Sequence, residues 1–94
     1  MSETTQLPSI ELGTVVMTRG VAAELAPEDV LVAISRHRNG DWGELCSEDW
    51  QLNDAAIVDG ARVLSTYRAA NGKKFWVITE WDRSVTTILL PEEY

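Results

Sequence analysis

The chain has 94 residues, 45% of them hydrophobic and 24% charged, which is typical of one folded domain and not of a disordered or fibrous protein. A single cysteine, Cys46, and a single histidine, His37, exclude a disulfide-stapled scaffold and the usual zinc sites. The formal net charge of −7 argues against direct binding to nucleic acid, which requires a basic surface.

The first residues predict a tail followed by a folded region. Residues 1–10 read as a flexible polar tail, and residues 11–94 as a single α+β domain. Neither a signal peptide nor a membrane-spanning apolar run of about 20 residues is recognisable, so we expect a cytoplasmic protein without a membrane partner. Residues 14–18 (TVVMT) are β-branched and apolar, which predicts a short strand or extended segment. Thr18 is suited to N-cap a short helix that runs to Glu24.

Two longer helices are predicted in the middle of the chain. The first begins at Pro27, because proline is favoured at the first helical position, and it ends at Asn39-Gly40. Ser47 is a good N-cap for the second, which ends at Gly60.

The last third of the chain contains three strand-like runs, residues 62–69, 74–81 and 84–90. Asn71-Gly72 separates the first two and is a strong hairpin signal; read as a two-residue loop, it places Tyr67 opposite Trp76. The predicted fold class is α+β, with two to three helices followed by a C-terminal three-stranded antiparallel β-meander. Both faces of this meander mix apolar and polar residues. We expect helices on one face and, on the other, an exposed aromatic patch of Tyr67 and Trp76 or a homodimer contact.

Acidic residues are concentrated in the first part of the chain. Residues 1–60 carry a net charge of −8, with eleven acids and three bases, whereas residues 61–94 carry +1. No basic residue interrupts a set of six acids: Asp41, Glu44, Glu48, Asp49, Asp54 and Asp59. Such a set is usually a solvated surface. Alternatively, it is a partner-binding surface that imitates nucleic-acid phosphates and occupies a basic groove on another protein.

A catalytic interpretation rests on a few polar side chains. His37 lies between Arg36 and Arg38, where it is either a general base or one of three cations that complement a helix C-terminus. Thr79, Glu80 and Arg83 gather near a strand end and turn. Cys46 has no neighbouring cation to activate its thiol, so we expect it to be a buried structural thiol or part of a helix-capping region. No motif for a metal, phosphate or dinucleotide is present, and we expect neither cofactor nor metal.

Two segments carry a family resemblance: residues 40–45 (GDWGEL) and residues 76–94, from WVITE to the terminal PEEY. Over about Leu12 to Tyr94, the chain resembles short proteins of bacterial plasmids, phages and integrative elements, labelled plasmid-related proteins or type I restriction endonuclease subunit M. Trp81 stands where these proteins tend to have a small residue. The resemblance implies a mobile-element context, in which accessory proteins often antagonise restriction or CRISPR defence.

The helix-then-sheet order also resembles small metal-free ribonuclease toxins. That resemblance implies a base, a phosphate clamp and an acid among five residues: His37, Arg68, Thr79, Glu80 and Arg83. The charge of −7 favours the other interpretation, a non-enzymatic acidic binding protein of anti-restriction or anti-CRISPR type whose partner is a basic host protein. A structural or regulatory dimerising module is the third alternative.

Overall fold

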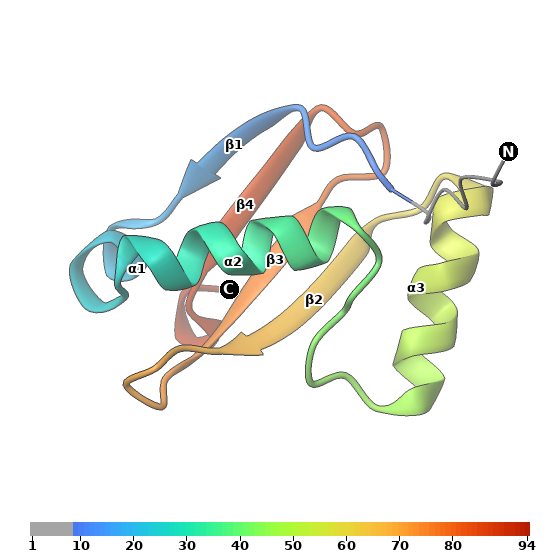
Figure 1. The fold of residues 1–94 in the computed structure, drawn as a ribbon. Helices are drawn as coiled ribbons and strands as arrows, with labels where there is room; N and C mark the ends of the chain where they lie inside the picture. Colours follow the sequence, from blue (N-terminus) through green and yellow to red (C-terminus); the bar gives the residue numbers. More distant parts are fainter. Residues whose placement is uncertain (1–8) are drawn as a thin grey trace, which may run out of the picture.

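The computed structural model describes residues 9–94, and the prediction of a tail over residues 1–8 lies outside this range. Eight elements follow in chain order (Figure 1): β1 (Thr14–Met17), α1 (Arg19–Glu24), α2 (Pro27–Arg38), α3 (Ser47–Asp59), β2 (Val63–Arg68), β3 (Lys74–Thr79), β4 (Val85–Leu89) and the 3₁₀ turn η1 (Pro91–Glu93). Ile10, which the predicted tail included, is buried, and its amide donates to the Arg38 carbonyl (3.0 Å).

The predicted α+β class is confirmed, but the sheet is larger than predicted. Its strand order is β1-β4-β3-β2, and β2, β3 and β4 form the antiparallel part. The difference is β1, which pairs parallel to β4 and makes the sheet four-stranded and mixed. Three helices and the strands β2 and β3 separate these two strands along the sequence, so no local signal indicates their pairing.

The helix boundaries follow local signals closely. Thr18 caps α1 by accepting from the Val21 amide, and Pro27 occupies the first turn of α2. Helix α3 begins at Ser47, one residue earlier than predicted, and Cys46 is in the cap position, where it is exposed rather than buried. Gly60 ends α3 in the left-handed conformation with φ 73°, which a residue without Cβ adopts at little cost.

The β2–β3 hairpin differs from the predicted register by one residue. Tyr67 pairs with Phe75, and Ala69 donates to the Lys73 carbonyl, so the loop has three residues, Ala70 to Gly72, rather than two. The Asn71 side chain accepts from the Lys73 amide and Gly72 has φ 89°, which together close this wider turn.

This one-residue shift corrects the predicted aromatic patch. Side chains alternate between the faces of a sheet, so Tyr67 and Trp76 lie on opposite faces instead of side by side. Tyr67 is 2% exposed and packs beneath α2 with Phe75, their ring centroids 5.9 Å apart. Only Trp76 remains on the other face, half-buried against Tyr94 at 5.5 Å between centroids.

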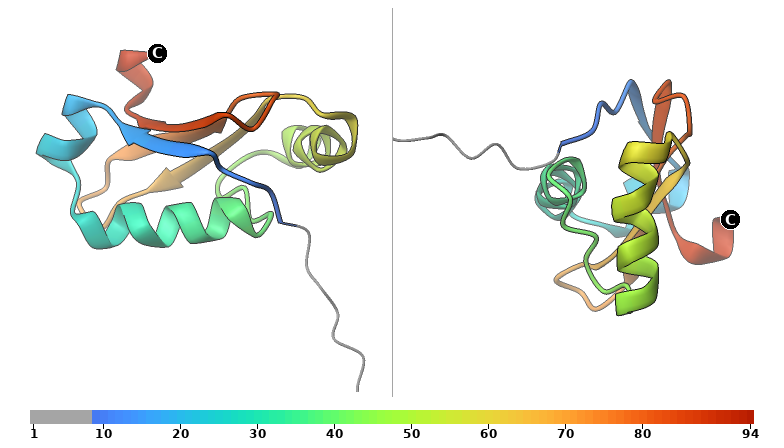
Figure 2. Two further views of the ribbon diagram at one scale, coloured as in Figure 1. Left: turned by 90° about the horizontal axis from the view of Figure 1, so that it is seen from above. Right: turned by 90° about the vertical axis from the view of Figure 1, so that its right-hand side faces the viewer.

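Two clusters form the core. The larger lies between the sheet and the helices α1 and α2; it contains Val21, Leu25, Val30, Ala33, Tyr67, Ala69, Phe75, Val77, Ile88 and Leu90. The smaller contains Ile10, Trp42, Ala56 and Val63 and fixes α3 beside the β2 edge. In Figure 2, α2 lies on one side of the sheet and the C-terminal segment on the other, so among residues 9–94 helices cover one face and this segment lies on the other.

The C-terminal segment is docked onto the sheet. The Glu93 carboxylate accepts from the Leu90 and Gly20 amides and from the Thr18 hydroxyl, tying η1 to the start of α1. These bonds to the ionised form lower the pKa of Glu93, with the Thr18 hydroxyl the largest cause. Within residues 9–94, no helix combines the length and apolar character needed to cross a membrane.

Candidate functional site

A continuous chain of polar side chains runs through the core. His37 Nδ1 bonds with Ser65 Oγ on β2, and its Nε2 lies 2.8 Å from Thr79 Oγ1 on β3. Thr79 Oγ1 lies 2.7 Å from Thr86 Oγ1 on β4, whose hydroxyl donates to the Leu12 carbonyl at 2.7 Å. The side chains of His37, Ser65, Thr79 and Thr86 are completely buried. This chain links α2, three strands and the N-terminal segment.

The direction of these hydrogen bonds fixes the state of the imidazole. A carbonyl only accepts, so the Thr86 proton is used on Leu12, and Thr79 must donate to Thr86. Thr79 therefore accepts from His37 Nε2–H, and Nδ1 accepts from Ser65. Burial, and then the charge of Arg83, lower the pKa of His37 from 6.5 to about 4. The histidine is thus neutral at pH 7, with its proton on Nε2.

The predicted catalytic residues are only partly brought together. His37 and Thr79 are in contact, and Glu80 and Arg83 follow at the same end of β3. Arg68 lies at the opposite end of β2, where it pairs with Glu44 (3.3 Å). Both ring nitrogens of His37 are engaged inside the core, whereas a general base needs a nitrogen within reach of substrate. His37 is also not one of the cations that complement the α2 terminus; Arg36 and Arg38 are exposed there.

Arg83 ties the β3–β4 turn to the end of α3. Its guanidinium donates to the carbonyls of Ala56 (3.1 Å), Ala61 (2.7 Å) and Glu80 (3.2 Å). The Ala56 carbonyl also accepts from the Gly60 and Ala61 amides, and a cation at a helix C-terminus complements the helix dipole. Arg83 has φ 60°, an unfavourable backbone conformation for a side chain with Cβ, which these bonds offset.

We expect Arg83→Ala to lower the free energy of unfolding by about 2 kcal/mol, because it leaves three carbonyls without their charged donor. Arg83→Gly loses the same bonds but relieves the left-handed backbone, so it should be about 1 kcal/mol more stable than Arg83→Ala. Urea denaturation of both variants measures the difference. Equal stability of the two variants would contradict the assigned backbone strain.

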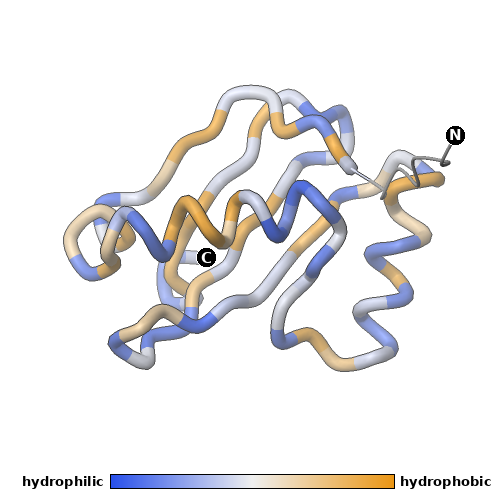
Figure 3. Tube along the Cα trace, viewed as in Figure 1, coloured by the Kyte–Doolittle hydropathy of each residue, from blue (hydrophilic) through white to orange (hydrophobic). Residues whose placement is uncertain are grey.

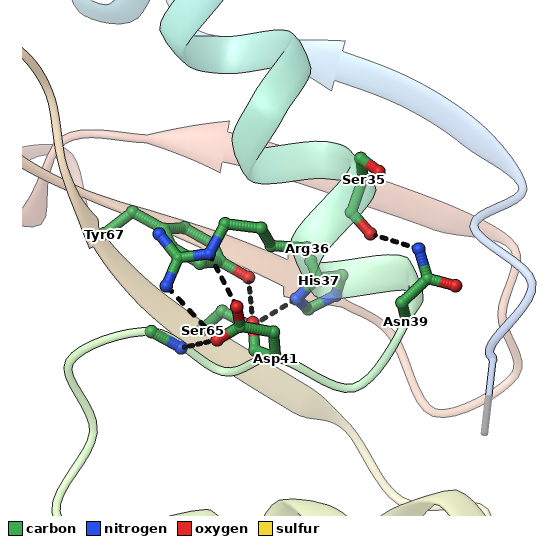
Figure 4. A network of polar contacts seen from close by, with 8 residues as sticks. Ser35, Arg36, His37, Asn39, Asp41, Ser65 and Tyr67 are labelled. Carbon is green, nitrogen blue, oxygen red and sulfur yellow. Dashed lines mark hydrogen bonds and ion pairs between the residues drawn. The ribbon is translucent and has the colours of Figure 1, made fainter. Parts of the chain in front are cut away.

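A second polar network fixes the connector between α2 and α3 (Figure 4). Arg36 donates to both carboxylate oxygens of Asp41, at 2.8 and 3.2 Å, and the Gly43 amide donates to the same carboxylate. The Tyr67 hydroxyl donates to the Asp41 carbonyl (2.6 Å), and the Arg36 guanidinium lies over the Tyr67 ring. The hydrogen bond from Arg36 lowers the pKa of Asp41, and burial raises the pKa of Tyr67.

The six predicted partner-binding acids fall into two groups. Asp41 pairs with Arg36, Glu44 pairs with Arg68, and Asp54 accepts from the Trp42 indole N–H (2.8 Å). The other three, Glu48, Asp49 and Asp59, are exposed on α3, and none forms an ion pair with another residue in 9–94. Of these six acids, the three that are exposed without a partner in residues 9–94 are therefore all on α3.

Helix α3 also presents apolar residues to solvent. Leu52 is 67% exposed and Val58 86% exposed, although the helix buries Asn53 and Ala56 against the domain. Beside Leu52 is a hollow of about 240 Å³ lined by Leu45, Asp49, Leu52, Asn53 and Leu64. We call Glu48, Asp49, Leu52 and Asp59 the α3 surface; Val58, six residues from Leu52, lies about 120° around the helix from it and is not part of this surface. Figure 3 shows hydrophobic and hydrophilic residues alternating along this helix.

Asn53 has a structural role that the sequence pattern did not predict. Its side-chain amide donates to the Leu64 carbonyl (2.6 Å), and its oxygen accepts from the Leu64 amide (3.3 Å). The side chain thus replaces a neighbouring strand at this point of the β2 edge. The one available signal is that asparagine is a poor helix former, yet it stands in the middle of α3.

Within residues 9–94, no group of three or more His, Cys, Asp or Glu side chains is arranged so that it could hold a metal ion. Comparisons of the chain with protein-family models, with curated proteins and with solved structures found no match.

Proposed function

We propose that this chain is a non-enzymatic binding protein whose α3 surface docks on a basic surface of another protein. The observation that carries the proposal is the combination on α3 of three exposed acids with the exposed Leu52, which borders a hollow of about 240 Å³. Apolar anchors in the centre of an interface contribute most of its binding energy, whereas charges around them contribute specificity and association rate.

The proposed partner is a nucleic-acid-binding protein of a host defence system. Segment 39–61 contains six acids and no lysine or arginine, so its field attracts basic surfaces. Such surfaces are common on proteins that bind phosphates. The resemblance to plasmid and phage proteins supports restriction or CRISPR components as the first partners to test.

The test uses a charge-reversed variant of the α3 surface, Glu48→Lys, Asp49→Lys and Asp59→Lys. Quantitative capture from host lysate should recover a nucleic-acid-binding protein with the wild-type chain and at least about tenfold less with the variant, because like charges then face each other. An added DNA competitor should displace the captured protein, since both would use its basic surface.

A matched control reverses three acids away from both α3 and β1: Glu28→Lys, Glu80→Lys and Glu92→Lys. This control has the same net charge as the α3 variant. A difference in capture between the two variants therefore depends on where the charges lie and not on the net charge. Equal capture by the two variants would show that the α3 surface is not the docking site. Loss of capture by Leu52→Ala alone would support the apolar anchor.

A further inference from the structure

The two edges of the sheet differ in how their backbone groups are used. At the β2 edge, Asn53 bonds both backbone groups of Leu64. The Thr66 amide donates to the Trp42 carbonyl (3.2 Å), and the Thr66 carbonyl accepts from the Glu44 amide (2.7 Å), so the connector before α3 covers the middle of this edge. An edge whose backbone groups are bonded at Leu64 and Thr66 is blocked against pairing with another strand.

The β1 edge is open within the described part of the chain. Thr14 donates to the Ser84 carbonyl and Thr18 to the Ile88 carbonyl, so the backbone groups of every second residue point toward β4. By this alternation, the N–H and C=O groups of Val15 and Met17 point outward. Among residues 9–94, no hydrogen bond outside the helices and strands involves these outward N–H and C=O groups. The side chains of β1 are 41–50% exposed at Val15, Val16 and Met17.

We propose that β1 pairs antiparallel with β1 of a second copy of this chain, forming a homodimer with a continuous sheet. With Val16 on the two-fold axis, Val15 of each copy lies opposite Met17 of the other. Each such pair exchanges both of its hydrogen bonds, so all the outward groups of these two residues are used. This inference does not depend on the proposed function, because α3 lies at the other edge of the sheet.

The charge distribution favours a second copy at this edge. Residues 12–23 contain no acid and one base, Arg19, although the chain as a whole carries −7. Glu11 precedes β1 and Arg19 follows it, and both are exposed. Antiparallel pairing therefore brings Glu11 of each copy to the end of the strand where the other copy has Arg19. A basic partner, by contrast, would be attracted to the acidic segment that contains α3.

Apolar side chains beside β1 are also suited to self-association. Val15 and Met17 share the face that carries α2, and Leu31 of α2 is 66% exposed on the same side of the sheet. Figure 3 shows the hydrophobic stretch of β1 at the rim of the molecule. A two-fold axis normal to the sheet keeps both copies of α2 on one face, so these residues of the two copies approach each other.

Sedimentation equilibrium of the full chain over a wide concentration series tests the dimer. We expect the mass to rise from 10.5 kDa toward twice that value. Val15→Pro removes one outward N–H from each copy and leaves the β1–β4 bonds intact, so it should weaken dimerisation about thirtyfold. The control substitutes Val58, an exposed valine on α3 at the other edge of the sheet. Proline at this position would break the helix, so the control variant is Val58→Lys, and it should leave the dimer unchanged.

Cross-linking tests the register. Cys46 is the only cysteine, so Cys46→Ser gives a background without thiols. In that background, Val16→Cys should oxidise to a covalent dimer, because residues opposite each other in a pair without hydrogen bonds have Cα atoms close enough for a disulfide. Val58→Cys, on α3, should not.

A chain that stays monomeric throughout the concentration series overturns the proposal. So does a dimer that Val15→Pro does not weaken and that Val16→Cys does not cross-link, since it would use another surface. If Val15→Pro has lost the native circular dichroism spectrum, Val15→Lys replaces it. The two introduced ammonium groups would then lie near the axis and repel each other, and the dimer should weaken by a similar factor.

Discussion

Lowering the pH from 7 to about 4 is expected to reduce the free energy of unfolding by about 3 kcal/mol through His37 alone. The pKa of this histidine is about 4 in the folded chain and 6.5 as an ordinary group. Between these values the unfolded chain binds a proton that the folded chain does not, so acid favours unfolding. The stabilisation is fully present above pH 6.5 and is lost as the pH falls toward 4.

Measurement at pH 5 separates His37 from the carboxylates. About 2 kcal/mol of the histidine effect is expected there. Asp41, Asp82 and Glu93 have lowered pKa values, so their contributions are lost only below their ordinary values of 3.8 to 4.5. Urea denaturation at pH 7 and pH 5 gives the difference for the wild-type chain.

The control is His37→Gln, which retains hydrogen-bonding groups but does not titrate. We expect it to be less stable than the wild type at pH 7, because the bonds to Ser65 and Thr79 are disturbed, and to show little change between pH 7 and 5. If the wild type and the variant lost equal stability over this range, the buried neutral histidine would not be the acid-sensitive group.

The second large effect is expected for Gly43→Ala, which should cost about 3 kcal/mol or more. Gly43 has φ 76°, and an added Cβ would overlap the Thr66 carbonyl oxygen and lie 2.7 Å from the Tyr67 ring. Tyr67 cannot move aside, because it is packed against Phe75 and bonded to the Asp41 carbonyl. The cost combines left-handed strain with overpacking.

Gly60→Ala is the matched control. Gly60 has a similar φ of 73°, but an added Cβ meets no atom within 4 Å, so only the backbone strain of about 1 kcal/mol is expected. Hydrogen exchange locates the difference, because the Glu44 amide is bonded to Thr66 across the β2 edge. It should lose protection in Gly43→Ala and keep it in Gly60→Ala. Similar stabilities of the two variants would mean that the connector does not need close contact with β2.

Much of the candidate site was accessible from sequence, because its position depends on local signals. Composition identifies the acids of residues 41–59. The N-terminal cap region and Gly60 identify the helix that carries Glu48, Asp49 and Asp59. Periodicity, however, did not identify the exposed apolar side chains. Leu52 lies at helical spacing from Ala55 and Ala56, yet only Ala56 is buried, because the orientation of α3 about its axis is set by contact with β2.

The sequence by itself determined the α+β class, the ends of the helices and the three antiparallel strands, because caps, prolines, glycines and β-branched runs act over a few residues. Only the tertiary structure decided the remaining features. These features are the pairing of β1 with β4, the exact register between β2 and β3, and the burial of His37. All three depend on contacts between distant segments. Such contacts are selected by the packing of the whole core, which no local pattern encodes.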